Sequence, residues 1–310
     1  MVLNACKRFV FLGGDMIGIP VGVRYMLLSA LGFALMGACV KAASHRGIPV
    51  LEIVAARALI SAGISYLDIK RKRISPGGHN KVLLTARGLI GTLALMCVFY
   101  AVTTLPLAEA TLLQYLHPVF TSVLAFVFIQ ETIQRSTVVC IVLSLAGLLI
   151  MVQPAILFGA LATRSASLPL LGVGAALLGA LGSGAAYVLI RRLSRTEDPS
   201  VIIFYFPFIA LPVACVLLGD GFVMPTGWAW ILLLLVGLFT QVAQYGLTRA
   251  MQTEDASKAT AYSYVQVIFA AILGWLLFDE IPTAHTLLGA LFITGGALVN
   301  VIYRKRPTGR

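Results

Sequence analysis

Residues 100–154 read YAVTTLPLAEATLLQYLHPVFTSVLAFVFIQETIQRSTVVCIVLSLAGLLIMVQP, and this stretch decides the fold. It holds two apolar runs, 108–129 and 135–152, separated by the short polar turn QETIQR at 130–135. A helix needs about 20 apolar residues to cross roughly 30 Å of hydrocarbon. The stretch therefore predicts two transmembrane helices joined by a tight turn.

The rest of the chain has the same character. Hydrophobic residues make up 59% of the 310 positions and charged residues only 11%. Soluble domains carry roughly 25% charged residues, and a soluble protein could not cover its surface with so little charge. Apolar runs recur from Tyr25 to Tyr303, so the lipid bilayer is predicted to be the solvent of this chain.

Division of the chain at charges, prolines and glycine clusters predicts an all-α integral membrane protein with ten transmembrane helices. The expected spans are 24–43, 49–68, 83–103, 108–129, 135–152, 169–190, 200–219, 228–249, 257–278 and 284–303. The expected organisation is a cytoplasmic N-terminal tail at 1–23, five spans within 24–152, an external linker at 153–168, five spans within 169–303 and a basic cytoplasmic tail at 304–310.

The basic residues predict the orientation of the chain. The net charge is +11, but Lys and Arg occur in short clusters between the apolar runs, which is a topology signal and not the pattern of a nucleic-acid-binding protein. If the N-terminus is cytoplasmic, only Lys41, Arg46 and Arg164 fall on the outer side. Both termini are therefore predicted to be cytoplasmic, in a multi-pass protein of the cell membrane.

The cysteines do not indicate a metal site or a disulfide framework. Cys6, Cys39, Cys97, Cys140 and Cys215 show no CxxC spacing, and four of them lie inside apolar spans. We expect small packing residues, with no metal and no cofactor. The short apolar stretch 9–12 is interrupted at 13–15, so the N-terminus is predicted to be a tail and not a cleaved signal peptide.

The two halves of the chain resemble each other. A shift of 149 positions superposes Ala110, Thr111, Tyr115, Phe120, Leu124, Glu131, Thr137, Gly147 and Leu149 on Ala259, Thr260, Tyr264, Phe269, Leu273, Glu280, Thr286, Gly296 and Leu298. A shift of 150 superposes Gly32, Ser44 and Pro49 on Gly182, Ser194 and Pro199. Five spans is an odd number, so the second copy is expected to cross the membrane in the opposite sense. Inverted repeats are typical of transporters whose substrate site lies near the midplane.

The quoted stretch closely resembles the end of the first EamA repeat of the drug/metabolite transporter superfamily. The resemblance is carried by PLAEA at 106–110, by Pro118 inside the fourth span, by Glu131 at the turn and by the glycines of the fifth span. Upstream, residues 48–62 (IPVLEIVAARALISA) resemble the second helix of the same repeat.

The second half departs from the family pattern at two places. Val267 stands where the helix proline is expected, and Ala256-Ser257-Lys258-Ala259 stands in place of PLAEA. The resemblance covers nearly the whole chain from Arg24 to Tyr303. It implies ten helices in two inverted five-helix repeats around a central cavity, and transport of amino acids, sugars, nucleobases or related metabolites.

Arg57 is a charge inside a predicted span. It lies about nine residues into its helix, roughly 13 Å deep at 1.5 Å per residue. A charge at the centre of a span costs about 2.5–3.5 kcal/mol, so it needs a partner or a wet cavity. One interpretation is an ion pair with Glu52 or Glu109. The other is an anchor for a carboxylate or phosphate of a substrate.

Polar residues form a stripe along the fourth span. They follow helical spacing: Thr111, Gln114, His117, Pro118 and Thr121. Pro118 removes one backbone donor and leaves the Gln114 carbonyl to be satisfied by a neighbour or a cavity. His117 is also a candidate proton carrier, since its charge changes near physiological pH. The ninth span carries Thr260, Ser263, Tyr264 and Gln266 in the equivalent places.

The eighth span carries a third stripe, formed by Gln241, Gln244, Tyr245 and Thr248, and Tyr100 is the repeat partner of Tyr245. For each of these residues the alternative is an ordinary hydrogen bond between helices, worth about 0.6 kcal/mol. The three stripes are expected to face a shared wet centre.

Four further charges are expected to be structural. Glu131 and Glu280 end the fourth and ninth spans, where a carboxylate suits the N-terminus of the next helix. Lys41 and its repeat partner Arg191 are expected to reach the outer and inner headgroups with their long side chains.

These patterns predict an alternating-access transporter that exports amino acids or related zwitterionic or anionic solutes. Sugars, nucleosides or drugs are the alternative substrates. The predicted substrate site consists of Arg57, Tyr100, Gln114, His117, Gln241, Gln244, Tyr245, Ser263, Tyr264 and Gln266. A membrane-embedded enzyme is disfavoured because the acidic residues lie near helix ends or in loops, and a scaffold would need no polar stripes. The expected partners are a small-molecule substrate and the bilayer, and the chain is a monomer or a homodimer.

Overall fold

The computed structural model describes residues 20–104, 113–152, 170–219, 221–278 and 284–302. Within these ranges the regular elements are helices, and no strand occurs. The helices are α2 (Val21–Ser44), α3 (Val50–Lys72), α4 (Lys81–Thr104), α6 (His117–Ile129), α7 (Arg135–Val152), α8 (Leu170–Leu193), α9 (Pro199–Leu218), α10 (Trp228–Thr253), α11 (Ala256–Ala261), the 3-10 helix η2 (Tyr262–Tyr264), α12 (Val265–Phe278) and α13 (Ala284–Ile302). The linker at 153–168, the tail at 304–310, Glu109, Glu280 and all but the end of the N-terminal tail lie outside the described residues.

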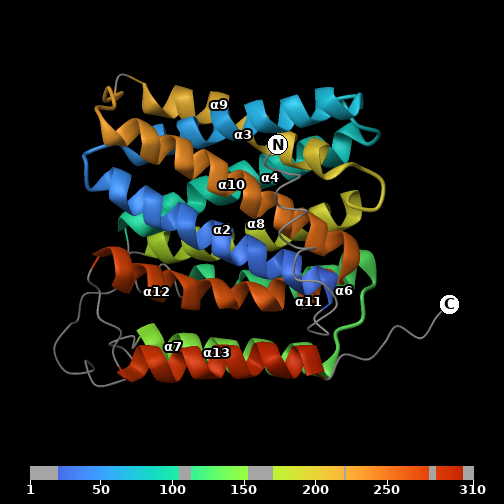
Figure 1. Ribbon diagram of the computed structural model, residues 1–310. Helices are drawn as coiled ribbons and strands as arrows, with labels where there is room; N and C mark the ends of the chain where they lie inside the picture. Colours follow the sequence, from blue (N-terminus) through green and yellow to red (C-terminus); the bar gives the residue numbers. More distant parts are fainter. Residues whose placement is uncertain (1–19, 105–112, 153–169, 220, 279–283, 303–310) are drawn as a thin grey trace.

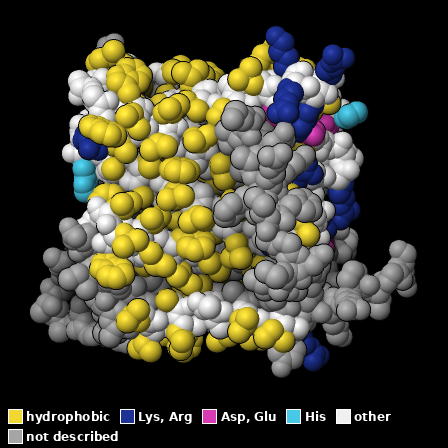
Figure 2. Space-filling model, viewed as in Figure 1, with side chains coloured by type: hydrophobic (Ala, Val, Ile, Leu, Met, Phe, Trp, Pro, Cys, Tyr) yellow, Lys and Arg dark blue, Asp and Glu magenta, His cyan; other side chains and the backbone are white. Residues whose placement is uncertain are grey.

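The surface of the helices is apolar, as a bilayer requires. Seven of the described helices are long and apolar enough to cross a membrane, and three more are apolar but shorter. Large hydrophobic side chains are exposed on the surface of the protein, with Leu170 89% and Val216 81% exposed. Figure 2 shows hydrophobic side chains across the middle of one face. Exposed apolar surface of this extent marks contact with lipid. The protein is therefore a multi-pass membrane protein.

Basic side chains gather at one end of the helices, which we call the basic end. It comprises the end of α3, the start of α4 and the end of α8, with Lys70, Arg71, Lys72, Arg73, Lys81, Arg191, Arg192 and Arg195. In Figure 2 the Lys and Arg side chains lie mostly along one edge of the molecule. At the opposite end the described chain carries Lys41 and Arg46. The charge asymmetry expected from the sequence is thus present in three dimensions.

The helices pack as pairs that correspond between the two halves. At the edges of the bundle α3 lies against α9 and α7 against α13 (Figure 1), and each pair joins equivalent helices of the two halves. In the interior, α2 packs on α10 as α8 packs on α4, and α2 packs on α12 as α8 packs on α6. Exchange of the halves therefore maps the main helix contacts onto one another.

Glycines allow these interior helices to cross closely. A Cβ atom on Gly32 of α2 would lie 3.0 Å from the Cβ of Ala243, and one on Gly182 of α8 would lie 2.9 Å from the Cβ of Ala94. These two glycines are the pair superposed by the shift of 150. Small residues at such crossings let membrane helices approach each other.

Buried polar contacts join α3 to α9 at the basic end. The Lys72 ammonium binds Asp68 at 2.8 Å and Asp198 at 2.7 Å. Asp198 also caps α9 by accepting a hydrogen bond from the Ser200 N–H. Burial alone favours the neutral acid, but the bonds from Lys72 and Ser200 outweigh burial and hold the pKa of Asp198 below its ordinary value. This contact is present while Asp198 is ionised.

At the crossing of α2 and α10, a Cβ on Gly246 would lie 2.7 Å from the Tyr25 carbonyl oxygen, which is backbone and cannot rotate away. We expect Gly246→Ala to lower the free energy of unfolding by about 1–3 kcal/mol, because backbone must move to admit the methyl group. Gly63→Ala is the matched control, since a Cβ on Gly63 meets nothing within 4 Å and alanine favours a helix by up to about 1 kcal/mol. The measurement is unfolding of purified protein in detergent by SDS titration. Equal stability of the two variants would contradict this packing.

Candidate functional site

Two helix interruptions meet at the centre of the molecule. The fourth span, predicted as one helix over 108–129, is broken by a turn at Tyr115 and Leu116, and α6 begins at His117. The ninth is broken at the equivalent place by η2. The Tyr115 and Tyr264 rings stack with centroids 6.0 Å apart, and the Tyr264 hydroxyl donates to the Tyr115 carbonyl at 3.0 Å. Repeat partners thus touch each other at the breaks.

The His117 side chain replaces the backbone N–H donor that Pro118 lacks. Its Nδ1 lies 3.2 Å from the Gln114 carbonyl oxygen, the group left without its helical partner. A neutral imidazole that donates through Nδ1 has a bare acceptor at Nε2. The Nε2 atom is buried and has no hydrogen-bond partner among the described residues. The edge of the ring meets Tyr187, with centroids 5.3 Å apart.

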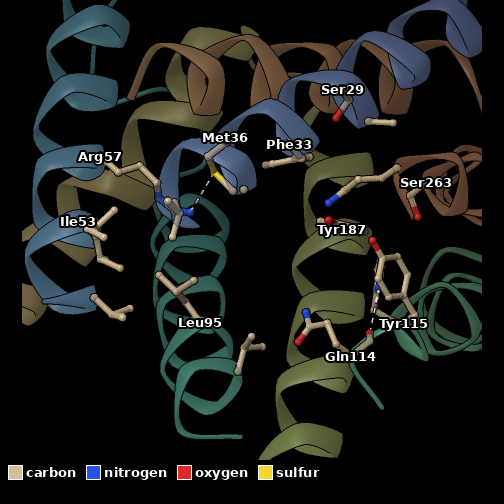
Figure 3. Close-up of a pocket in the computed structure, with 18 of the residues that line it drawn as sticks. Ser29, Phe33, Met36, Ile53, Arg57, Leu95, Gln114, Tyr115, Tyr187 and Ser263 are labelled. Carbon is tan, nitrogen blue, oxygen red and sulfur yellow. Dashed lines mark hydrogen bonds between the residues drawn. The ribbon is translucent and has the colours of Figure 1, made fainter. Parts of the chain in front are cut away.

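A cavity of about 350 Å³ lies beside the two breaks. Volumes of this size hold a small metabolite. Figure 3 shows side chains from α2, α3, α4, α8 and both breaks directed at it. Its lining consists of Met26, Ser29, Ala30, Phe33, Met36, Gly37, Val40, Val50, Ile53, Val54, Arg57, Leu95, Val98, Gln114, Tyr115, His117, Tyr187, Ser263 and Gln266. The lining is mainly apolar, with a few polar groups, as in typical ligand sites.

The cavity reaches the end of the bundle opposite the basic end. Gly37 and Val50, which line it there, are exposed. Toward the basic end it stops near Met26, which is 2% exposed and belongs to the largest hydrophobic cluster. The cavity is therefore closed on the basic side by packed apolar residues.

An ion-pair network lies beyond this cluster. Arg191 of α8 donates to Glu131 at 2.7 Å, to the Met251 carbonyl at 2.6 Å and to Asp255 at 3.1 Å. The second Glu131 oxygen accepts the Ala256 N–H at 2.7 Å. We call these residues the basic-end network. They tie α6 to α8, α10 and α11.

This network corrects two expectations from sequence. Arg191 does not extend to the headgroups: it is 9% exposed, and its charge is compensated inside the protein. Glu131 binds at the N-terminus of α11, in the other half of the chain, and not at the next helix. Lys41, the repeat partner of Arg191, lies 4.5 Å above the Phe278 ring.

Arg57 faces the cavity without an ion pair. Its Nη1 lies 3.8 Å from the Met36 sulfur, drawn in Figure 3, and its guanidinium lies 5.6 Å from the Phe206 ring centroid. Glu52 accepts the Val223 N–H at 2.9 Å instead. The predicted pair of Arg57 with Glu52 is not formed, and no carboxylate of the described residues lies within ion-pair distance of Arg57. The alternative partner Glu109 lies outside those residues.

Half of the predicted site residues lie together and half do not. The cavity is lined by Arg57, Gln114, His117, Ser263 and Gln266. Gln241 lies elsewhere, hydrogen-bonded to Ser61 and Ser65 between α10 and α3. Tyr245 packs edge-on against Tyr25 and accepts from Arg249.

The other three predicted residues also lie off the cavity lining. They are Tyr100, Gln244 and Tyr264. Tyr100 is 48% exposed, and the Tyr264 hydroxyl is occupied by the Tyr115 carbonyl. The eighth-span stripe thus faces neighbouring helices and not the cavity.

Four residues that the sequence reasoning missed lie in or near the cavity: Ser29, Tyr115, Tyr187 and Arg87. Ser29 is fully buried, and its hydroxyl has no partner among the described residues. Arg87 had a readable signal, because it is a charge inside the third span, as costly there as Arg57. Ser29 and Tyr187 had none, since single hydroxyl groups are common in membrane helices.

Comparison with known proteins identifies the family. The model of the EamA-like transporter family matches residues 20–153 and again residues 170–302. The chain belongs to the EamA-like transporter family. The resemblance to the EamA family over nearly the whole chain is thus confirmed. The protein is accordingly a membrane transporter of small metabolites.

Relatives in this family come from bacteria and animals. The chain is 33% identical over 273 residues to the pseudopaline exporter CntI of Pseudomonas aeruginosa, covering 88% of this chain and 93% of that protein. It is 28% identical over 296 residues to the human solute carrier family 35 member G1, covering 92% of this chain and 80% of that protein. One crystal structure shares the fold with a TM-score of 0.72 at 21% identity, over 89% of this chain and 96% of that one.

The position of Gln241 leads to a test of its role. We expect Gln241→Leu to lower the free energy of unfolding by about 1 kcal/mol, because the Ser61 and Ser65 hydroxyls lose their partner, and to leave substrate affinity unchanged. The variant that combines Q241L with S61A and S65A should recover most of the loss, since no buried polar group is then left unpaired. SDS titration and ligand-binding isotherms provide the two measurements. Lost binding at normal stability would place Gln241 in the substrate pathway.

Proposed function

We propose that this EamA-like transporter exports amino acids or related zwitterionic and anionic metabolites by alternating access. The observation that carries the proposal is that one cavity is lined by two groups suited to a zwitterion. They are the guanidinium of Arg57 and the Nε2 atom of His117, which has no hydrogen-bond partner among the described residues. A guanidinium binds carboxylates through a fork of donors. The name of the relative CntI, an exporter, supports the direction.

His117 is proposed to recognise the amine of the substrate. With Nδ1 engaged by the Gln114 carbonyl, Nε2 can accept one hydrogen bond from an ammonium or N–H group. The Ser29 hydroxyl, also buried and unpaired among the described residues, lines the same cavity and can complete the polar contacts. Apolar residues such as Phe33 of α2 and Leu95 and Val98 of α4 form the remaining wall, which suits the carbon skeleton of the substrate.

The membrane arrangement is proposed to be ten spans in two oppositely threaded five-helix repeats, with both termini in the cytoplasm of a cell-membrane protein. The matching helix contacts of the two halves support the repeat. The meeting of Tyr115 and Tyr264 supports a two-fold axis between them. The basic end is the cytoplasmic side by the positive-inside rule.

Alternating access is proposed to depend on closure at one end at a time. The cavity reaches the end opposite the basic end, while the basic-end network and the packed cluster close the cytoplasmic side. In the sequence repeat Lys41 corresponds to Arg191. An inward-facing state would then break the basic-end network and close the opposite end near Lys41 and Phe278.

The substrate class is tested by thermal-shift measurements of purified protein against amino acids, organic anions, sugars and nucleosides. A ligand at 100 times its Kd adds about 2.7 kcal/mol of apparent stability. We expect amino acids or organic anions to raise the Tm, and the variants Arg57→Gln and His117→Asn to lose the shift. Asparagine can keep the donor toward Gln114 while it removes the Nε2 acceptor.

Arg46→Gln is the control for loss of a cation, because Arg46 is exposed and its guanidinium donates to the Ala42 carbonyl near the end of α2. Efflux from proteoliposomes loaded with the stabilising compound then tests transport itself. A shift by sugars or nucleosides alone, unaffected by Arg57→Gln, would overturn the proposed substrate class.

The closure of the basic end is tested by access of a polar thiol reagent. We expect Arg191→Gln to raise at least tenfold the rate at which Thr121→Cys is labelled from the basic end, in a background without the five native cysteines. Thr121 is fully buried on α6, and loss of one partner of a buried ion pair costs about 3–5 kcal/mol. Arg192→Gln is the matched control, since Arg192 is exposed. The same labelling rate in both variants would contradict the proposed closure.

A further inference from the structure

A second arginine lies beside the cavity, inside the third span. Arg87 is six residues into α4, about 9 Å from its start at 1.5 Å per residue. It is 4% exposed, and its Nε atom has no hydrogen-bond partner among the described residues. Its guanidinium lies 4.9 Å from the centroid of the Phe206 ring. This is a buried charge that cannot reach the headgroup region from its position.

Arg57 and Arg87 lie beside the same aromatic ring. Arg57 lies 5.6 Å from the same Phe206 ring, so two helices bring two cations to one aromatic side chain. The two guanidinium groups therefore lie within roughly 10 Å of each other, and two like charges at that distance repel each other where the dielectric constant is low. Arg57 lines the cavity. The positive potential of both arginines therefore extends into the cavity.

The carboxylates of the described residues do not neutralise this pair. Glu131 and Asp255 bind Arg191, and Asp68 and Asp198 bind Lys72. Glu197 accepts the backbone N–H groups of His79 and Asn80 at 2.7 Å. Glu52 accepts the Val223 N–H, and Glu254 lies beside Gly22 at the start of α2. None of these carboxylates forms an ion pair with Arg57 or Arg87.

A buried charge in a membrane protein is paired or marks the path of a ligand. We propose that the substrate carries two separate carboxylates: Arg57 binds one directly, and Arg87 favours the second through its charge. This inference rests on the proposed function and narrows its substrate class. A single compact phosphate fits less well, because Arg57 lines the cavity and Arg87 lies behind that lining, so the two charges act at different positions.

The expected size of the effect follows from Coulomb's law. For one unit charge at roughly 10 Å and an effective dielectric constant of about 20, the attraction corresponds to about a tenfold change in Kd. Removal of the Arg87 charge should therefore cost a dicarboxylate about tenfold in affinity. It should leave a monocarboxylate that binds through Arg57 much less affected.

The test compares dicarboxylates with their monomethyl esters, which differ by one charge at nearly the same shape. The probes are glutamate, glutarate, succinate and iminodiacetate, each with its ester, measured by thermal shift and titration calorimetry on the purified full-length protein. We expect at least one dicarboxylate to bind about tenfold or more tightly than its ester. Arg87→Gln should abolish this preference, Arg87→Lys should retain it, and Arg46→Gln should leave it unchanged. Phosphoserine against serine tests the phosphate source.

Equal binding of diacid and ester in every pair, including no binding of either, would overturn the inference. This comparison uses the unsubstituted protein, so it does not depend on whether a variant folds. If the preference for the diacid persists in Arg87→Gln, Arg87 does not contribute to substrate recognition. If phosphoserine binds more tightly than every dicarboxylate, the substrate carries a phosphate and not a second carboxylate. The experiment distinguishes failure of this inference from failure of the proposed function. If monocarboxylic amino acids bind through Arg57 while the diacids show no advantage, only this inference fails; if no metabolite binds, both fail.

Discussion

Backbone groups inside a bilayer must find hydrogen-bond partners within the protein, because the lipid offers none. This constraint explains why the two helix interruptions lie where they do. At the first, the His117 ring satisfies the Gln114 carbonyl. At the second, Ser263 donates to the Thr260 carbonyl at 2.6 Å, and Tyr264 reaches across to the Tyr115 carbonyl. Each break is thus stabilised by side chains, and both border the cavity.

The same constraint separates two kinds of buried cation. Arg191 is surrounded by acceptors, with Glu131, Asp255 and the Met251 carbonyl in contact, so its charge is compensated within the fold. Arg57 and Arg87 have an aromatic ring and a sulfur atom instead. A compensated cation joins helices, whereas an uncompensated one at a cavity suits an anionic ligand. In the proposed function, the compensated arginine serves closure and the two uncompensated arginines serve recognition.

Some of the residues that the sequence analysis selected line the cavity, and others do not. Gln114, His117, Ser263 and Gln266 were found because a proline and a polar stripe marked their helix faces, and the internal repeat linked the two faces. The Gln241 stripe obeyed the same spacing, yet it faces Ser61 and Ser65. Helical spacing tells which residues share a face but not which neighbour that face meets.

The sequence by itself determined that the chain is a membrane protein of apolar helices, because apolar run length and charge placement follow directly from the thickness and polarity of a bilayer. The breaks at Tyr115 and at η2 were not determined in this way. The tertiary structure alone decided the partners of the charges. Arg191 meets Glu131 across 60 residues of chain, and Arg57 meets Phe206 instead of the nearby Glu52. Such pairings depend on how helices rotate and cross, and that is set by the packing of all their neighbours together.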